Sequence, residues 1–163
     1  MHSPQEDESI HNASRVDIQI IDSTADLPDH CDLDQLSDFL HIALKPFEDT
    51  KEDIRQALGY VFASGQHPNG FLVLATDTAL GRTVGAAVVH FTPWSGYVPE
   101  NLLLFIAVDP SCRGRGIGSD LLTAVIEKCK GNIKLHVEYD NPAMRLYKRA
   151  GFTAKYAEMR LVR

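Results

Sequence analysis

Glycines and arginines concentrate in one short stretch of the chain, and these residue types at this spacing are suited to binding an anion. Residues 108–119 read VDPSCRGRGIGS, with three alternate glycines and two arginines: Gly114, Gly116, Gly118, Arg113 and Arg115. Glycine lets the backbone approach a ligand closely or adopt a positive φ, and successive backbone N–H groups in such a turn attract anions. A helix that starts here would add the positive end of its dipole. The stretch is therefore predicted to hold a pyrophosphate.

A dinucleotide-binding fingerprint is the nearest alternative for the same glycines. Its acidic residue would be Glu138, which lies about twenty residues after Gly118. In that fingerprint the glycine turn follows its strand almost directly, whereas residues 109–113 intervene here. Ser119 also stands where the third glycine is needed. The spacing therefore argues against a dinucleotide site.

Cysteine and histidine form no metal-binding pattern in the sequence. The three cysteines contain no Cys-x-x-Cys pair, and His30 beside Cys31 lacks a second pair of ligands at metal spacing. We therefore expect no metal site and no disulfide framework.

Charge and hydropathy argue against a nucleic-acid-binding, a secreted or a membrane-spanning protein. The net charge of −6 over 163 residues provides no basic face for nucleic acid. The polar, acidic N-terminus lacks the basic and apolar regions of a secretory signal, and no apolar run approaches the roughly 20 residues that span a bilayer. We expect a cytoplasmic protein that binds neither nucleic acid nor membrane, and its acidity mildly favours a cationic partner.

The first half of the chain alternates strands and helices. Residues 1–15 offer little to bury and are predicted to be a flexible arm before one domain that spans 16–163. Apolar residues at period two predict a strand over 16–20, and steps of three and four predict helices over 33–44 and from Thr50 onward. Two apolar runs, 71–75 and 84–91, predict a hairpin.

The second half places the glycine stretch between a strand and a helix. Residues 102–108 are apolar at every position, which predicts a strand buried on both faces. A helix over 116–130 and a strand over 133–138 complete a parallel βαβ unit. Asn141 is predicted to cap a last helix with Pro142 at its first position, and residues 152–162 are predicted to close the chain as a strand.

Two motifs in this order resemble those of the GNAT acyltransferase superfamily. RGRGIG at 113–118 matches the Arg/Gln-x-x-Gly-x-Gly/Ala acetyl-CoA motif, and NPAMRLYKRAGF at 141–152 resembles the family's second motif of Asn, Ala, Tyr and Gly-Phe. Together with the preceding strand they cover about 50 residues. The resemblance implies an α/β fold with a twisted mixed sheet, flanked by helices, whose fourth and fifth strands splay apart around the pantetheine arm.

The resemblance also implies how acetyl-CoA, the cosubstrate, would be held. Backbone groups near Ile106 and Val108 would bind the pantetheine and the acetyl carbonyl, and Asn141 would contribute from the far side. The pyrophosphate would be bound by the amides of Arg113, Gly114, Arg115, Gly116, Ile117, Gly118 and Ser119.

The implied reaction is direct attack of a primary amine on the thioester in a ternary complex. Tyr147 matches the family's tyrosine and would be the general acid that protonates the departing thiolate. The carboxylate that families often place midway along the fourth strand is missing from LLLFIA at 102–107. Glu100, His90 and Glu138 are the remaining candidates for the general base.

The sequence identifies neither the acceptor nor the oligomeric state. There are two alternatives to an N-acetyltransferase. One is a GNAT-fold module that binds acyl-CoA without turnover, and the other is an acyltransferase that acts on hydroxyls or protein N-termini. The acceptor, a small molecule or a peptide, would be shaped by the early helices and the loop before Glu100, where no motif occurs. A homodimer through the late strands or the Trp94–Tyr97 loop is a further hypothesis.

Overall fold

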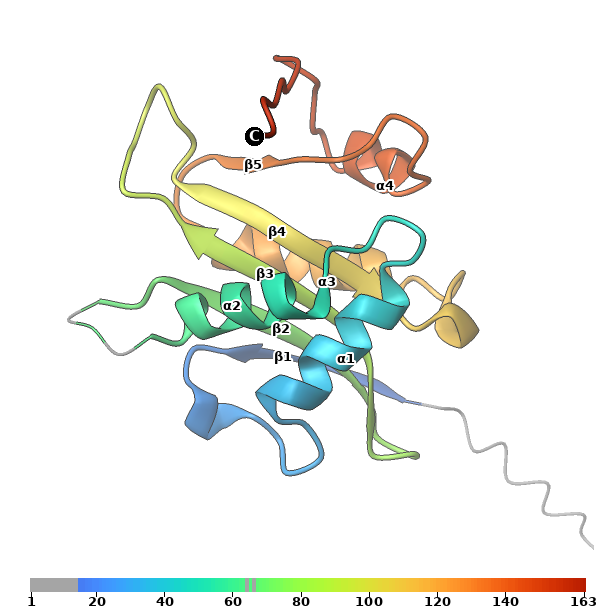
Figure 1. Cartoon of the computed structure of the whole chain (residues 1–163). Coiled ribbons are helices and arrows are strands. Elements are labelled where there is room, and N and C mark those ends of the chain that lie inside the picture. Colours follow the sequence, from blue (N-terminus) through green and yellow to red (C-terminus); the bar gives the residue numbers. More distant parts are fainter. Residues whose placement is uncertain (1–14, 64, 66) are drawn as a thin grey trace, which may run out of the picture.

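The computed structural model describes residues 15–63, 65 and 67–163, so the predicted N-terminal arm lies outside the described residues except for Arg15. Elements follow in the order expected up to the last helix (Figure 1). They are β1 (Val16–Ile21), η1 (Thr24–Asp26), α1 (Leu33–Ala43), α2 (Lys51–Val61), β2 (Gly70–Asp77), β3 (Arg82–Phe91), β4 (Asn101–Val108), η2 (Pro110–Cys112), α3 (Ile117–Lys128), β5 (Ile133–Leu135) and α4 (Met144–Arg149).

Five strands form one mixed sheet in the order β1-β2-β3-β4-β5. The first four strands are antiparallel to their neighbours, and β5 is parallel to β4 across three residue pairs, from Asn101 with Ile133 to Leu103 with Leu135. The predicted hairpin and the predicted parallel βαβ unit are thus confirmed. The mixed sheet flanked by helices is the fold class that the sequence predicted.

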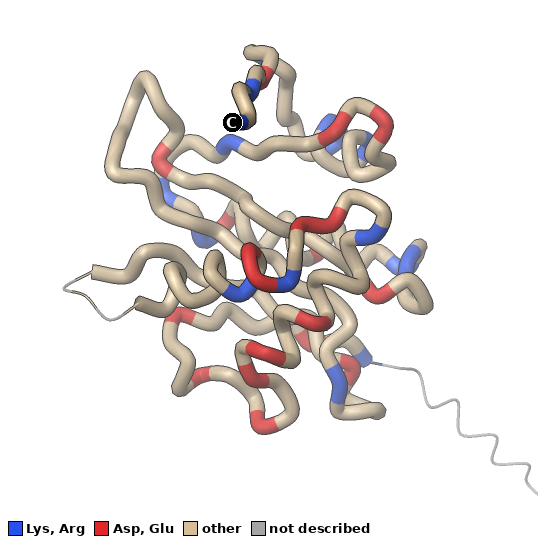
Figure 2. Tube along the Cα trace, viewed as in Figure 1, with Lys and Arg blue, Asp and Glu red and all other residues tan. Residues whose placement is uncertain are grey.

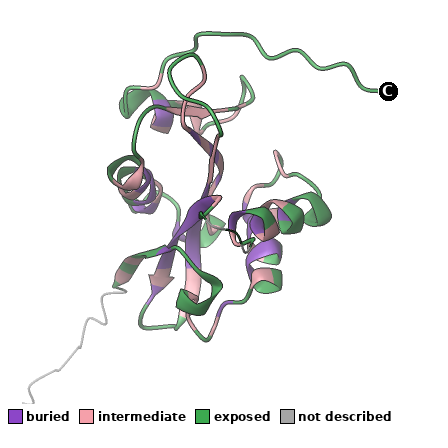
Figure 3. Cartoon of the chain, turned by 90° about the vertical axis from the view of Figure 1, so that its left-hand side faces the viewer, coloured by how far each residue is buried: buried purple, intermediate pink, exposed green. Residues whose placement is uncertain are grey.

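Helices cover both faces of the sheet, and a separate apolar core lies beneath each layer (Figure 3). One core joins the sheet to α1 and α2 through fully buried Leu36, Leu40, Ile54 and Leu58. The other joins it to α3 through Leu121 and Val125. Local side-chain bonds cap the starts of both helices. Asp32 and Gln35 form a capping box at the start of α1. At the start of α2, the Thr50 hydroxyl accepts a hydrogen bond from the Asp53 amide at 3.1 Å.

Strand β4 contains an irregularity that changes which face its side chains occupy. Val88 of β3 pairs with Phe105 and Val89 pairs with Leu103, so Leu104 has no residue opposite it. Such a β-bulge reverses the alternation of side chains along the strand. As a result Phe105 packs in the core beneath α1 and α2, whereas Leu103 packs in the core beneath α3.

Three predictions for the C-terminal part are wrong. Residues 152–162 form no strand, because no neighbouring strand bonds to them. Strand β5 ends at Leu135, so Glu138 lies beyond it, and α4 begins at Met144 rather than at Pro142. Strand β4 is also buried less completely than predicted, because residues at alternate positions along it are only half-buried.

Candidate active site

The loop between β4 and α3 ends in backbone amides that are available to an anion. Gly114 and Gly116 have φ values of +76° and +84°, which residues with a Cβ rarely adopt. Gly116 is the N-cap of α3 and supplies no side-chain cap, and the first amide bonded to the helix backbone is Asp120 N, at 3.0 Å from Gly116 O. The N–H groups of Ile117, Gly118 and Ser119 therefore lack intrahelical acceptors. Together with the helix dipole they form an anion-binding end.

An ionic clamp fixes the start of this loop. The carboxylate of Asp109 accepts bonds from the Ser111 amide at 2.8 Å, from the Ser111 hydroxyl at 2.6 Å and from the Arg82 guanidinium at 2.5 Å. Hydrogen bonding to Ser111 and the Arg82 partner lower the pKa of Asp109 to about 2. The clamp ties the loop to the start of β3.

The Arg113 side chain binds protein backbone rather than lying free for a ligand. Its guanidinium donates to the carbonyl oxygen of Ala43 at 2.8 Å and to that of Val108 at 3.3 Å. Ala43 is the last residue of α1, where a cation is favoured by the helix dipole. Arg113 therefore joins the loop to α1, a role that the sequence did not indicate.

The second sequence motif packs against the first. A Cβ added at Gly118 would lie 3.6 Å from Leu146 of α4 and 3.7 Å from Val108 of β4. Asn141 does not cap α4 but forms a turn before it, since its Oδ1 accepts from Ala143 N at 2.9 Å. Tyr147 is buried in the core beneath α3, with its ring edge against Phe152, and burial raises the pKa of its phenol to about 12.

Strands β4 and β5 separate beyond their three paired residues. From Phe105 to Val108, β4 pairs only with β3, so the side of β4 that faces residues 136–138 has no strand partner. This unpaired stretch includes Ile106 and Val108 and leads directly to the glycine loop. An extended chain could add its hydrogen bonds there as a strand would.

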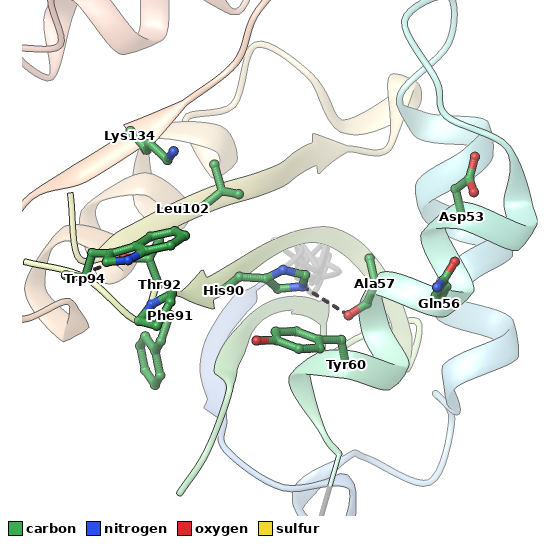
Figure 4. Close-up of a pocket in the computed structure, with 11 residues that line it drawn as sticks. Asp53, Gln56, Ala57, Tyr60, His90, Phe91, Thr92, Trp94, Leu102 and Lys134 are labelled. Carbon is green, nitrogen blue, oxygen red and sulfur yellow. Dashed lines mark hydrogen bonds between the residues drawn. The ribbon is translucent and has the colours of Figure 1, made fainter. Parts of the chain in front are cut away.

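A cavity of about 480 Å³ lies beside the point where the two strands separate (Figure 4). Leu102 of β4 and Lys134 of β5, which form one of the three pairs, line it on one side. Helix α2, the end of β3 and the following loop provide the other walls, with Asp53, Gln56, Tyr60, His90 and Trp94. The cavity is thus on the α2 side of the sheet.

His90 is held in one tautomer at the wall of this cavity. Its Nε2 lies 3.1 Å from the carbonyl oxygen of Ala57 and its ring centroid lies 4.9 Å from that of Tyr60 (Figure 4). A carbonyl only accepts, so Nε2 carries the hydrogen and, in the neutral ring, Nδ1 retains its lone pair. Burial lowers the pKa of His90, although the bond to Ala57 opposes this shift. The neutral base therefore predominates at physiological pH.

The two glutamates that the sequence suggested lie elsewhere. The carboxylate of Glu100 accepts from the amides of Asn132 at 2.7 Å and Gly96 at 3.3 Å, and these bonds lower its pKa. This carboxylate joins the loop before β4 to the start of β5. Glu138 is exposed, three residues beyond the end of β5. Of the three base candidates, only His90 lines the cavity.

Most of the cavity wall was not predicted from the sequence. Asp53, Gln56 and Tyr60 recur at steps of three and four along α2, on a face distinct from its buried residues Ile54, Leu58 and Val61. This polar and aromatic stripe was the available signal. Trp94 and Lys134 carried no comparable signal.

A family model for the acetyltransferase (GNAT) family matches residues 35–152, which include the loop, the splayed strands and α4. The chain belongs to the GNAT family of acyltransferases. A sequence search finds no match among curated proteins. The GNAT motifs therefore identify the family without indicating which acceptor this member uses.

Solved structures of GNAT proteins share the fold. A GNAT acetyltransferase from Streptococcus pneumoniae superposes with a TM-score of 0.63 at 20% identity, with 91% of this chain and 98% of that chain covered. A ribosomal-protein-alanine N-acetyltransferase from Brucella melitensis gives 0.62 at 17% identity, with 91% and 99% covered. An aminoglycoside acetyltransferase from a soil metagenomic sample, in complex with sisomicin, gives 0.61 at 19% identity, with 91% and 95% covered.

Membrane-spanning helices and metal-binding clusters are both absent from the described residues. No helix among residues 15–63, 65 and 67–163 is both long and apolar enough to cross a membrane. The same part of the chain contains no group of three or more His, Cys, Asp or Glu residues placed to hold a metal ion.

Proposed function

We propose that this GNAT protein transfers the acetyl group of acetyl-CoA to a primary amine by direct attack in a ternary complex. The observation that carries the proposal is the alignment of three features along β4. The amide-rich start of α3, the unpaired side of β4 and the cavity with His90 follow one another in that order. The pyrophosphate would bind at the first feature, the pantetheine along the second and the amine in the third.

The amides of residues 113–119 would bind the pyrophosphate in this arrangement. Backbone N–H groups and the helix dipole attract phosphate oxygens, and glycines at 114 and 116 keep side chains away from them. The backbone of Ile106 and Val108 would bind the pantetheine as a neighbouring strand does. Asn141 would approach from the side of α4.

His90 would act as the general base. A lysine-like amine is only about 0.1% neutral at physiological pH, a cost of roughly 4 kcal/mol without a base. The unprotonated Nδ1 of His90 can accept this proton, while Ala57 fixes the other nitrogen. Tyr147, with its raised pKa, would remain protonated and supply the proton for the departing thiolate.

Residues 16–163 would form this single catalytic domain. The enzyme would be cytoplasmic, because three unpaired cysteines fit a reducing compartment.

Calorimetric titration with CoA and with NAD tests the cofactor. We expect CoA to bind and to raise the unfolding free energy by about 2.7 kcal/mol at a hundredfold excess over its Kd, whereas NAD does neither. Binding of NAD without CoA would overturn the proposal.

A thiol-release assay with amines, alcohols and peptides tests turnover. Release that depends on an amine supports the proposal. Release only with alcohols would identify an O-acyltransferase, and CoA binding without release by any acceptor would favour the non-catalytic module.

A further inference from the structure

Lys134 is a half-buried cation on the wall of the cavity. It belongs to β5, where it pairs with Leu102 of β4. Five other cations of residues 15–63, 65 and 67–163 form ion pairs, whereas the ammonium of Lys134 forms neither an ion pair nor a hydrogen bond with any of these residues. A charge that is partly removed from water without a partner favours the binding of an opposite charge beside it. The cavity wall at Lys134 is therefore suited to an anion.

Lys134 is too far from the glycine loop to bind the pyrophosphate of CoA. Its strand partner Leu102 lies near the start of β4, whereas the glycine loop follows Val108 at the other end of that strand. The six residue steps between Leu102 and Val108 correspond to about 20 Å of extended strand at 3.3 Å per residue. The anion that Lys134 would bind therefore belongs to the acceptor and not to the cofactor.

A carboxylate lines the cavity on the side of α2. Asp53 accepts a hydrogen bond from the Thr50 hydroxyl at 2.8 Å, and it forms no ion pair within the part of the chain that the structure describes. Figure 4 shows Lys134 and Asp53 on opposite sides of the cavity, with His90 between them. A positive and a negative side chain that border the same space are complementary to a molecule that carries both charges.

Aromatic side chains form the uncharged part of the cavity wall. Tyr60 and Trp94 both line the cavity and are exposed, so their rings can cover the carbon skeleton of a ligand. The volume of about 480 Å³ is within the range of sites for small molecules. A diamine of similar length would place an ammonium beside Lys134, and this like-charge contact would disfavour it. The cavity therefore fits a small zwitterion better than a molecule with amines alone.

We propose that the acceptor is a free amino acid, whose carboxylate binds Lys134 and whose amine is presented to His90. This inference rests on the proposed acetyl transfer and names its acceptor. In that reaction the amine nitrogen forms a bond to the acetyl carbon while the bond between that carbon and sulfur breaks. The ammonium form of the acceptor loses two protons and the departing thiolate takes up one, so one proton is released in each turnover. The carboxylate only holds the acceptor, so its removal should affect KM more than kcat.

Acceptors that differ only in the carboxylate test the role of Lys134. Each standard amino acid that supports thiol release is compared with the amine left by its decarboxylation, such as lysine with cadaverine. We expect kcat/KM to be about ten- to hundredfold higher for the amino acid, which is the effect of one charge-assisted hydrogen bond. Lys134→Gln should lose this preference through a higher KM for the amino acid, and Lys134→Glu should prefer the decarboxylated amine. Lys130→Gln is the matched control, because Lys130 is an exposed lysine just before β5 that does not line the cavity, and it should keep the preference.

Calorimetric titration of the amino acids into CoA-saturated protein separates this inference from the proposed activity. The affinity for the amino acid should fall about ten- to hundredfold in Lys134→Gln and stay unchanged in Lys130→Gln. Such binding without thiol release by any acceptor would refute the acetyl transfer and leave the carboxylate site in place. The proposal is wrong if a decarboxylated amine binds and reacts as well as its amino acid, or if the preference persists in Lys134→Gln. It is also wrong if no standard amino acid either binds or supports turnover.

Discussion

Burial acts in opposite directions on the pKa values of the two side chains proposed as base and acid, and each direction suits the proposed role. It disfavours the charged form of either group, so it lowers the pKa of His90 and raises that of Tyr147 to about 12. At neutral pH the histidine is therefore an unprotonated base and the tyrosine a protonated acid. Pairs of groups whose pKa values are driven apart in this way are typical of acid–base catalysis.

Replacing His90 by glutamine should remove the base and leave the fold intact. We expect turnover to fall by about 10² to 10⁴. In the parent enzyme, kcat/KM should rise with pH and level off above a pKa lower than 6.5, because only the neutral ring accepts a proton. The rise of kcat/KM with pH should be absent in His90→Gln when both proteins are assayed with an acceptor that stays neutral over the whole pH range.

A second histidine provides the control for that variant. His41 Nδ1 also contacts a backbone carbonyl, that of Asp49 at 2.9 Å, but the residue belongs to α1 and does not line the cavity. His41→Gln should keep both the turnover rate and the rise of kcat/KM with pH. A full rate in His90→Gln would show that the amine loses its proton to water or to another group.

Replacing Tyr147 by phenylalanine tests the general acid. The ring and its contact with Phe152 remain, so the melting temperature should change little. The rate should fall by about 10² to 10⁴ with a nearly constant KM for acetyl-CoA. If a folded Tyr147→Phe retains more than about a third of the turnover, which lies far outside that range, the tyrosine is a core residue and the thiolate leaves unassisted.

At the level of elements, the start of α3 should determine cofactor binding. Gly116→Asp adds a Cβ where φ is +84° and a negative charge where the pyrophosphate would bind, so CoA binding should be abolished in a titration. Gly96→Asp is the control, because it imposes similar strain at φ +81° in the loop between β3 and β4, at the opposite end of β4 from the glycine loop. Normal CoA binding by a folded Gly116→Asp would place the phosphate site elsewhere.

The clamp at the start of the glycine loop should appear in the dependence of stability on pH. The pKa of Asp109 is lowered to about 2 in the fold, so its carboxylate stabilises the protein above pH ~4, and this contribution disappears as the pH falls toward 2. Asp109→Asn should lose up to about 2 kcal/mol of unfolding free energy at neutral pH.

Urea unfolding of the parent and of Asp109→Asn at several pH values measures this loss. The difference between the two should shrink between pH ~4 and ~2. Asp17→Asn, at an exposed position of β1, should show no such change. A difference that is constant with pH would mean that the charge of Asp109 does not stabilise the loop.

The sequence predicted the elements that local patterns determine. Glycine spacing located the loop, three- and four-residue periodicity located α1 and α2, and the strand–helix–strand order predicted the parallel pairing of β4 with β5. These features depend on residues near one another in the chain. They could therefore be recognised without knowledge of the packing.

Features that depend on distant contacts could not be predicted. Residues 152–162 have a strand-like composition, but a strand requires a partner, which the sequence does not specify. The bulge at Leu104 and the bond of Arg113 to Ala43 likewise arise from packing between separate elements. The role of Glu100 appears only when its amide partners at Gly96 and Asn132 are known.

At the level of the whole molecule, opposite charges are placed near the two expected substrates. Residues 29–55 contain eight carboxylates and three basic side chains, and Figure 2 shows the acidic positions gathered along α1, α2 and their connection. Two of the carboxylates pair with cations, Asp38 with Lys51 and Asp34 with Arg55. One of the remaining carboxylates, Asp53, lines the cavity together with Lys134, whereas the glycine loop carries two arginines. A cationic amine would thus be attracted to the acceptor side.

This charge distribution predicts how salt affects acceptor capture. For a cationic amine, kcat/KM should fall as ionic strength rises, because the Debye length shortens to about 10 Å at 0.1 M. For an uncharged acceptor it should stay nearly constant. Asp53→Asn, which keeps the shape of a residue lining the cavity, should raise KM for the cationic amine and weaken the salt dependence. Asp120→Asn on α3 is the control and should change neither. A kcat/KM for cationic amines that does not vary with salt would show that the acidic helices serve solubility and that the acceptor is selected by contacts within the cavity.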